Sequence, residues 1–114
     1  GAPTRTFCYI SDAISGYLAC LLYGKYDYFN IGSDSQEISV IEFAKIFENY
    51  GKILFKYSGK IKFEDSKDAD YMTNNPNRRC PNITKAKTLL NYHPQISIES
   101  GVKQYLTFIK QEGK

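Results

Sequence analysis

The chain has 114 residues, which fits one domain with a core large enough to fold without disulfides or a structural metal. Hydrophobic residues make up 42% and charged residues 24%, a globular composition that argues against disorder. The net charge of +3 comes from scattered lysines with acids between them, so no nucleic-acid-binding face is expected.

The cysteines and the hydropathy pattern indicate in which cellular compartment the protein is expected. The three cysteines, Cys8, Cys20 and Cys80, cannot all pair within one molecule, and their spacing matches no zinc pattern. No signal-peptide pattern precedes them, and no apolar run reaches the length of a membrane span. We therefore expect a cytoplasmic protein with reduced thiols, without a metal and without a membrane partner.

In chain order, the hydrophobic spacing predicts about three short strands and four helices. The expected strands are residues 4–10, 26–31 and 60–64, and the expected helices are residues 11–23, from 40 onward, 82–92 and from 98 onward. Ser39 and Glu42 form the S-x-x-E capping box before the second helix. Residues 65–81 have no periodicity and hold two prolines, which indicates a loop.

The order of these elements sets the fold class. Strands and helices do not alternate strictly, so an α+β layer arrangement is expected for residues 1–114 as one domain. Apolar residues at helical spacing line one face of the first helix. They are Ile10, Ile14, Tyr17, Leu18, Leu21 and Leu22.

Several catalytic patterns are missing from the sequence. It has no G-x-G-x-x-G or P-loop spacing, and no tyrosine is followed four positions later by a lysine. His93 is interpreted as a helix-end cation or a spectator, because one histidine cannot form a metal cluster. Asp65, Asp68 and Asp70 lack the glycine and distal glutamate of a calcium loop. We predict no catalytic residue in this chain.

The three arginines are the candidate binding residues. Arg5 lies at the start of an expected strand, and Arg78 and Arg79 lie in a loop framed by Pro76 and Pro81. A guanidinium binds phosphate with two parallel hydrogen bonds, and a proline-restricted loop loses less entropy on binding. The composition alone leaves an alternative open, in which Arg79 pairs with a structural carboxylate and Arg78 faces water.

Six segments resemble extended short-chain dehydrogenase/reductases that act on nucleotide-sugars, in particular the NAD-dependent epimerase/dehydratase branch that includes UDP-glucuronate decarboxylases. The segments are residues 4–13 (TRTFCYISDA), 28–32 (YFNIG), 38–40 (ISV), 75–83 (NPNRRCPNI), 85–94 (KAKTLLNYHP) and 97–101 (SIESG). They occur in the family's order and cover almost the whole chain. Asn75, Asn82 and Asn91 depart from the family pattern, which has Asp, Asp and Gly there.

The resemblance implies that the chain is the C-terminal lobe that closes over a nucleotide-sugar, most simply a UDP-sugar. Arg5 and Arg79 match family arginines on the nucleotide diphosphate, and Arg78 falls at a more variable position. The family's NAD-binding Rossmann domain, with its catalytic tyrosine and lysine, would precede Gly1 and be absent. No cofactor site is expected in this chain, and NAD is expected in the parent enzyme, an isomerase or lyase.

Two other functions remain open from the sequence. The domain could work alone as a binding or protein-interaction module without catalysis. Weak nucleic-acid binding is the third hypothesis, and it predicts a steep loss of binding with salt. A lobe separated from its partner exposes former interface, so self-association through aromatic surface into a homo-oligomer is a further expectation.

Overall fold

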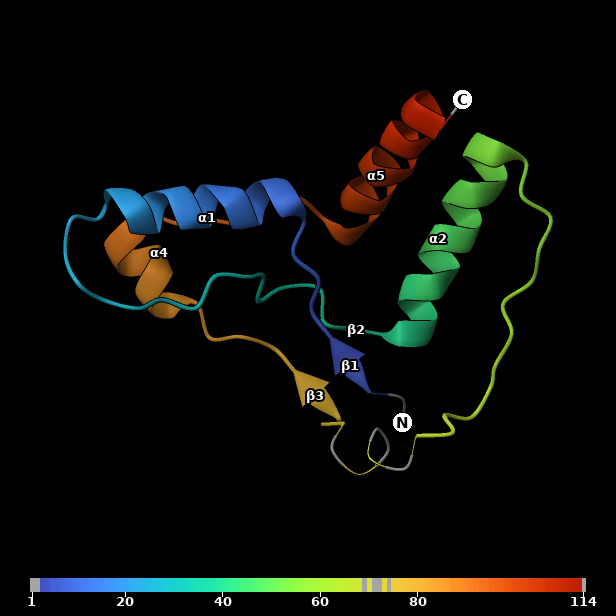
Figure 1. The fold of residues 1–114 in the computed structure, drawn as a ribbon, viewed down its shortest axis with the longest axis horizontal. Coiled ribbons are helices and arrows are strands. Elements are labelled where there is room, and N and C mark those ends of the chain that lie inside the picture. The colour runs from blue at the N-terminus through green and yellow to red at the C-terminus, as the bar shows by residue number, and fades with distance from the viewer. Residues whose placement is uncertain (1–2, 69, 71–72, 74, 114) are drawn as a thin grey trace.

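The computed structural model describes residues 3–68, 70, 73 and 75–113, and over these residues the chain forms four helices and a three-stranded sheet (Figure 1). The elements are β1 (Thr4–Arg5), α1 (Ile10–Leu22), β2 (Ile38–Ser39), α2 (Val40–Phe55), β3 (Arg78–Arg79), α4 (Thr84–Leu90) and α5 (Ile98–Gly113). The predicted α+β class is confirmed.

The sheet joins segments that lie far apart in the chain. Its order is β2-β1-β3, with β1 antiparallel to β2 and parallel to β3. The parallel ladder pairs Thr4 with Arg78 and Arg5 with Arg79. It extends one step further, because the Thr6 amide donates to the Arg79 carbonyl at 3.3 Å. The central strand thus sets the register of the two arginine-bearing segments.

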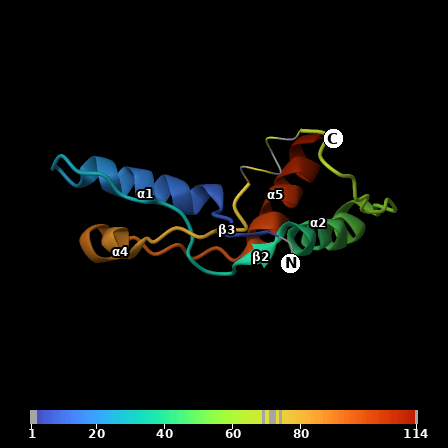
Figure 2. The same ribbon diagram turned by 90° about the horizontal axis from the view of Figure 1, so that it is seen from below.

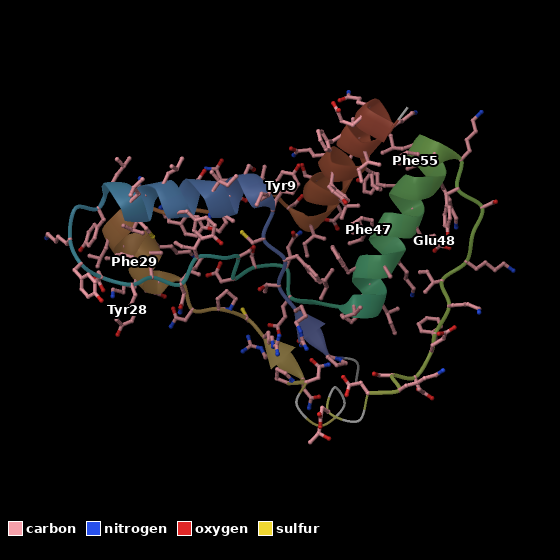
Figure 3. The ribbon with its side chains drawn as sticks, in the orientation of Figure 1. Tyr9, Tyr28, Phe29, Phe47, Glu48 and Phe55 are labelled. Carbon is pink, nitrogen blue, oxygen red and sulfur yellow. The ribbon has the colours of Figure 1, made fainter. Side chains whose placement is uncertain are left out.

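The helices form two pairs at opposite ends of the molecule, α1 with α4 and α2 with α5 (Figures 1 and 2). Aromatic rings tie the second pair to the residues after β1. Phe7 stacks on Phe43 with ring centroids 3.7 Å apart, and Phe43 meets Phe47 edge to face at 5.0 Å. Phe47 lies on the side of α2 that faces α5 (Figure 3), where its ring is 6.4 Å from that of Tyr105.

The first pair of helices holds a small core around Ile83, Ala86 and Tyr92. The Tyr92 hydroxyl donates to the Gly32 carbonyl at 2.8 Å, which anchors the loop after residue 31 to this core. Gly16 of α1 is required by close approach, because a Cβ there would lie 2.5 Å from the Ile31 side chain. This core fixes one wall of the region where β1 and β3 meet.

The molecule is flat and leaves apolar surface uncovered. Its radius of gyration is 16.9 Å, against about 13 Å for a compact chain of this length. The apolar face of α1 points away from α4 and the core: Leu22 is 82% exposed and Leu21 is 78% exposed. The helical spacing of that face was correctly predicted, but its partner is not among the described residues. None of the described helices is long and apolar enough to cross a membrane.

Side-chain caps begin two of the helices, and a left-handed residue ends a third. The capping box before α2 is formed: the Glu42 amide donates to Ser39 Oγ at 3.1 Å, and the Ser39 amide donates to Glu42 Oε2 at 2.7 Å. Ser97 Oγ accepts from the Ser100 amide at 3.1 Å at the start of α5. Asn91 ends α4 with φ of 53°, a left-handed conformation in which Gly and Asn are tolerated.

Two expected strands and one expected loop are wrong. Residues 26–31 form no strand; their alternation reflects Phe29 and Ile31 packing on the core while Tyr26 and Tyr28 are exposed. Residues 60–64 likewise form no strand. The expected loop at 65–81 instead contributes β3, because pairing with β1 makes Arg78–Arg79 a strand that no local pattern indicates.

Candidate functional site

An open groove of about 540 Å³ lies where β1 and β3 meet the loop after residue 31. Nine residues line it: Arg5, Thr6, Cys8, Gly32, Ser33, Arg78, Arg79, Cys80 and Pro81. Figure 3 shows nitrogen-bearing side chains gathered at this junction. All three arginines predicted as binding residues therefore border one groove, although their role stays a prediction.

Strand register explains why Arg5 and Arg79 lie together. They are direct partners in the parallel ladder, and paired residues of neighbouring strands project from the same face of a sheet. Thr4 and Arg78 lie one position earlier on each strand and so alternate with Arg5 and Arg79 in the pleat, although Arg78 also lines the groove. Because side chains alternate along a strand, Arg5 and Arg79 share one direction and Arg78 has the other.

Arg5 is held by neutral partners. One of its terminal nitrogens (Nη1) donates to the carbonyl of Thr4 at 2.7 Å, and the other (Nη2) donates to the side-chain oxygen of Asn75. These contacts orient the guanidinium but do not compensate its charge. A guanidinium has five N–H donors, so three of them remain for a ligand.

Arg78 is the arginine that pairs with a carboxylate. Its Nε donates to Glu37 Oε2 at 3.1 Å and forms an ion pair with Glu37 Oε1 at 2.8 Å. Thr4 Oγ1 donates to Glu37 Oε1 at 2.7 Å. The hydrogen bond from Thr4 and then that from Arg78 lower the pKa of Glu37. Glu37 in turn raises the pKa of Arg78.

Arg79 has an exposed side chain with no hydrogen bond or ion pair to residues 3–68, 70, 73 or 75–113. This is the reverse of the alternative left open by composition, in which Arg79 would pair with a carboxylate and Arg78 would face water. Arg5 and Arg79 therefore lie on one groove, and no side chain in the described part of the protein compensates their positive charge.

The cysteines at the groove are free thiols whose sulfur atoms contact hydroxyl and carbonyl oxygens. Cys8 Sγ lies 3.7 Å from the Tyr92 hydroxyl, whose pKa is raised first by burial and then by the Cys8 contact. Cys80 Sγ donates to the Asp34 carbonyl at 3.7 Å. No base lies within these contacts, so neither thiol is arranged as a nucleophile.

The other candidates lie away from the groove. The His93 ring contacts Asn91 at 3.0 Å beyond the end of α4. Asp68 accepts from the Asp70 amide at 3.0 Å, a local turn contact. Within the described residues there is no group of three side chains that could hold a metal ion.

Sequence reasoning missed several contributors to the groove. Gly32 lets Pro81 approach closely, since a Cβ at Gly32 would lie 3.3 Å from the Pro81 ring. Glu37 directly precedes β2, and only its pairing with Arg78 reveals its part. The departure at Asn75 was visible in the sequence, but its contact with Arg5 was not.

Relatives of this chain are found among known proteins. No protein-family model matches the chain. UDP-glucuronic acid decarboxylase 1 of Xenopus tropicalis is 32% identical over 112 residues, which are 98% of this chain and 24% of that protein. UDP-glucuronate 4-epimerase of Thermodesulfobacterium geofontis (strain OPF15) is 32% identical over 111 residues, 97% of this chain and 32% of that protein.

Solved structures agree. UDP-glucuronic acid 4-epimerase from Bacillus cereus, in complex with UDP-glucuronic acid and NAD, matches with a TM-score of 0.74 and 29% identity over 97% of this chain and 33% of its own. UDP-glucose 4-epimerase from Thermotoga maritima, with UDP-glucose, matches in fold with a TM-score of 0.77 at 22% identity, over 100% of this chain and 34% of its own.

The chain thus has the fold of the C-terminal lobe of UDP-sugar epimerases. It is homologous to that part of the UDP-glucuronic acid decarboxylases and UDP-glucuronate 4-epimerases, which confirms the resemblance found in the sequence. It spans about a quarter to a third of the length of the curated relatives it matches.

Proposed function

We propose that residues 1–114 form the nucleotide-sugar-binding domain of an NAD-dependent UDP-sugar epimerase, dehydratase or decarboxylase. The observation that carries the proposal is the pairing of Arg5 with Arg79 across the β1–β3 ladder, on one groove and without a carboxylate partner among the described residues. Homology to UDP-sugar enzymes supports the choice of ligand. In this role the two arginines bind the diphosphate.

The energetics of two guanidinium groups suit a diphosphate. Each charge-assisted hydrogen bond contributes about 1.5–3 kcal/mol, so two contribute about 3–6 kcal/mol, or two orders of magnitude or more in affinity. Arg5 is already oriented by Asn75, which reduces the side-chain entropy lost on binding. The planar fork of each arginine also matches two phosphate oxygens at once.

The remaining chemistry would belong to another part of the protein. This sequence has neither the glycine-rich turn of a dinucleotide site nor a Tyr-x-x-x-Lys pair, so a Rossmann part would hold NAD and the proton-transfer groups. Bound NAD would supply the hydride acceptor for oxidation at C4 of the sugar. The uncovered face of α1 would pack on that part, and the three free thiols fit a cytoplasmic location.

The test is a binding and kinetic comparison on the protein at its full genomic length. Arg79→Ala is expected to raise both the Kd for UDP and the KM for the UDP-sugar about tenfold or more, the loss of one charge-assisted contact. Lys62→Ala is the matched control, because it removes one positive charge from an exposed ion pair outside the groove. An unchanged KM in a folded Arg79→Ala protein would remove Arg79 from the site.

A second candidate function, a protein-interaction module without catalysis, is favoured by the exposed apolar face of α1. That candidate predicts no saturable binding of UDP, whereas the nucleotide-binding proposal requires it. Calorimetric titration of the same protein with UDP, and with uridine as the phosphate-free control, separates the two.

A further inference from the structure

Glu37 forms a clasp across all three strands of the sheet. It directly precedes β2, it accepts from Thr4 on β1 at 2.7 Å, and it pairs with Arg78 on β3 at 2.8 Å. Its side chain is 25% exposed, while that of Arg78 is 69% exposed. The clasp therefore holds a partly covered carboxylate against a guanidinium at the edge of the groove.

We infer that Glu37 limits the groove to two uncompensated positive charges by neutralising Arg78, and that this count favours UDP-sugars relative to free UDP. The inference rests on the proposed function and assigns Glu37 as a positioning residue that acts through Arg78. It goes beyond the family comparison, because it concerns a residue outside the arginine motifs.

The charge count follows from the partners of each arginine. Arg78 faces a carboxylate, Arg5 faces an amide oxygen and a carbonyl, and Arg79 has no partner in the described part of the chain. Only the first contact cancels a charge. Asn75 is neutral, so its contact with Arg5 leaves the charge of Arg5 uncompensated. The two residues together set how strongly the groove attracts anions.

Free UDP and UDP-glucose differ in charge at the phosphate that the arginines of the groove would contact. The terminal phosphate of UDP loses a second proton with a pKa of about 6, so at pH 8 free UDP carries one more negative charge than UDP-glucose. A third free guanidinium would interact with that extra charge and would strengthen UDP binding more than UDP-glucose binding. Glu37 removes that advantage and so protects the groove from occupation by free UDP.

The experiment compares the Kd of UDP with that of UDP-glucose by calorimetry at pH 8, on the protein at its full genomic length. Glu37→Gln keeps a side-chain oxygen that can accept from Thr4 and Arg78 but removes the charge. It is expected to lower the Kd of UDP, relative to that of UDP-glucose, about two- to fivefold at low salt. The shift should disappear near 1 M salt, where the Debye length is about 3 Å.

Two further variants make the result decisive. Asn75→Asp adds a carboxylate beside Arg5 and should shift the same ratio in the opposite direction, so it also carries the test if Glu37→Gln fails to fold. Glu48→Gln makes the same charge change on α2, outside the groove, and should leave the ratio unchanged.

The outcomes separate the inference from the proposed function. Absence of UDP binding by the unaltered protein would overturn the proposed function. Normal UDP binding with an unchanged UDP to UDP-glucose ratio in folded Glu37→Gln and Asn75→Asp proteins would overturn the inference alone. A ratio that moves equally in Glu48→Gln would show a general charge effect and would also overturn it.

Discussion

The two faces of the β1–β3 ladder hold the same kind of residue in different electrostatic states. On one face Arg78 is paired with Glu37, which also accepts a hydrogen bond from Thr4. On the other, Arg5 and Arg79 stand opposite each other with only neutral partners or none among the described residues. Under the proposed function, the partner of an arginine, more than its exposure, distinguishes a structural role from a binding role. Arg78 and Arg79 are both exposed neighbours, yet they separate cleanly by this criterion.

The double variant Arg5→Ala/Arg79→Ala is the strongest way to break this comparison. We expect at least about a hundredfold loss of UDP affinity, because both charge-assisted contacts to the diphosphate are removed. The thermal midpoint should change little, since neither side chain has an ionic partner in the described chain. Calorimetry gives the affinity and circular dichroism gives the midpoint.

Lys60→Ala/Lys62→Ala is the control for the double variant, since it removes two positive charges from exposed positions outside the groove. If the arginine double variant bound UDP within about threefold of the control, the two guanidinium groups would not share the ligand, and the binding face would be wrongly assigned.

Arg78→Ala tests the opposite face and should have the smaller effect on binding. We expect the UDP affinity to change by no more than about threefold, because the charge of Arg78 is already compensated by Glu37. Its thermal midpoint should fall, since the variant breaks the contact that joins β3 to β2. A tenfold loss of affinity with an unchanged midpoint would instead make Arg78 a direct ligand contact.

The sequence reasoning succeeded where the signals are local. The capping box at Ser39 and Glu42 needs only its own four residues, and the structure forms it as predicted. The family motifs name Arg5 and Arg79 as candidates, and the structure places both on one groove, while their binding role stays a prediction. The helical elements could therefore be predicted, within a few residues at their ends.

The failures were non-local. β3 exists because β1 lies beside it, and two consecutive arginines have no strand preference of their own. The Glu37–Arg78 pair bridges residues 41 positions apart, which no pattern within a segment can indicate. The first helix, α1, shows a second limit. Its residue spacing predicts an apolar face, but the sequence does not indicate which surface packs against that face.

The smallest expected effect is the pH dependence of the stability that the Glu37–Arg78 pair contributes. Hydrogen bonds from Thr4 and Arg78 lower the pKa of Glu37 below its ordinary value of 4.5. A carboxylate whose folded-state pKa is depressed stabilises the fold above its unfolded pKa, and that contribution is lost as the pH falls through the folded pKa. The clasp should therefore contribute at pH 6 and vanish in acid.

Comparing the unaltered protein with Glu37→Gln isolates this contribution. Asp27 and Glu42 also have lowered pKa values, but they titrate alike in both proteins and cancel from the difference. We expect Glu37→Gln to have the lower thermal midpoint at pH 6, and the gap to close progressively below about pH 4.5. If the difference in thermal midpoint stayed constant from pH 6 into acid, the charge of Glu37 would not hold the contact with Thr4 and Arg78. The environment of Arg78 would then differ from that of Arg5 and Arg79 by hydrogen bonding alone.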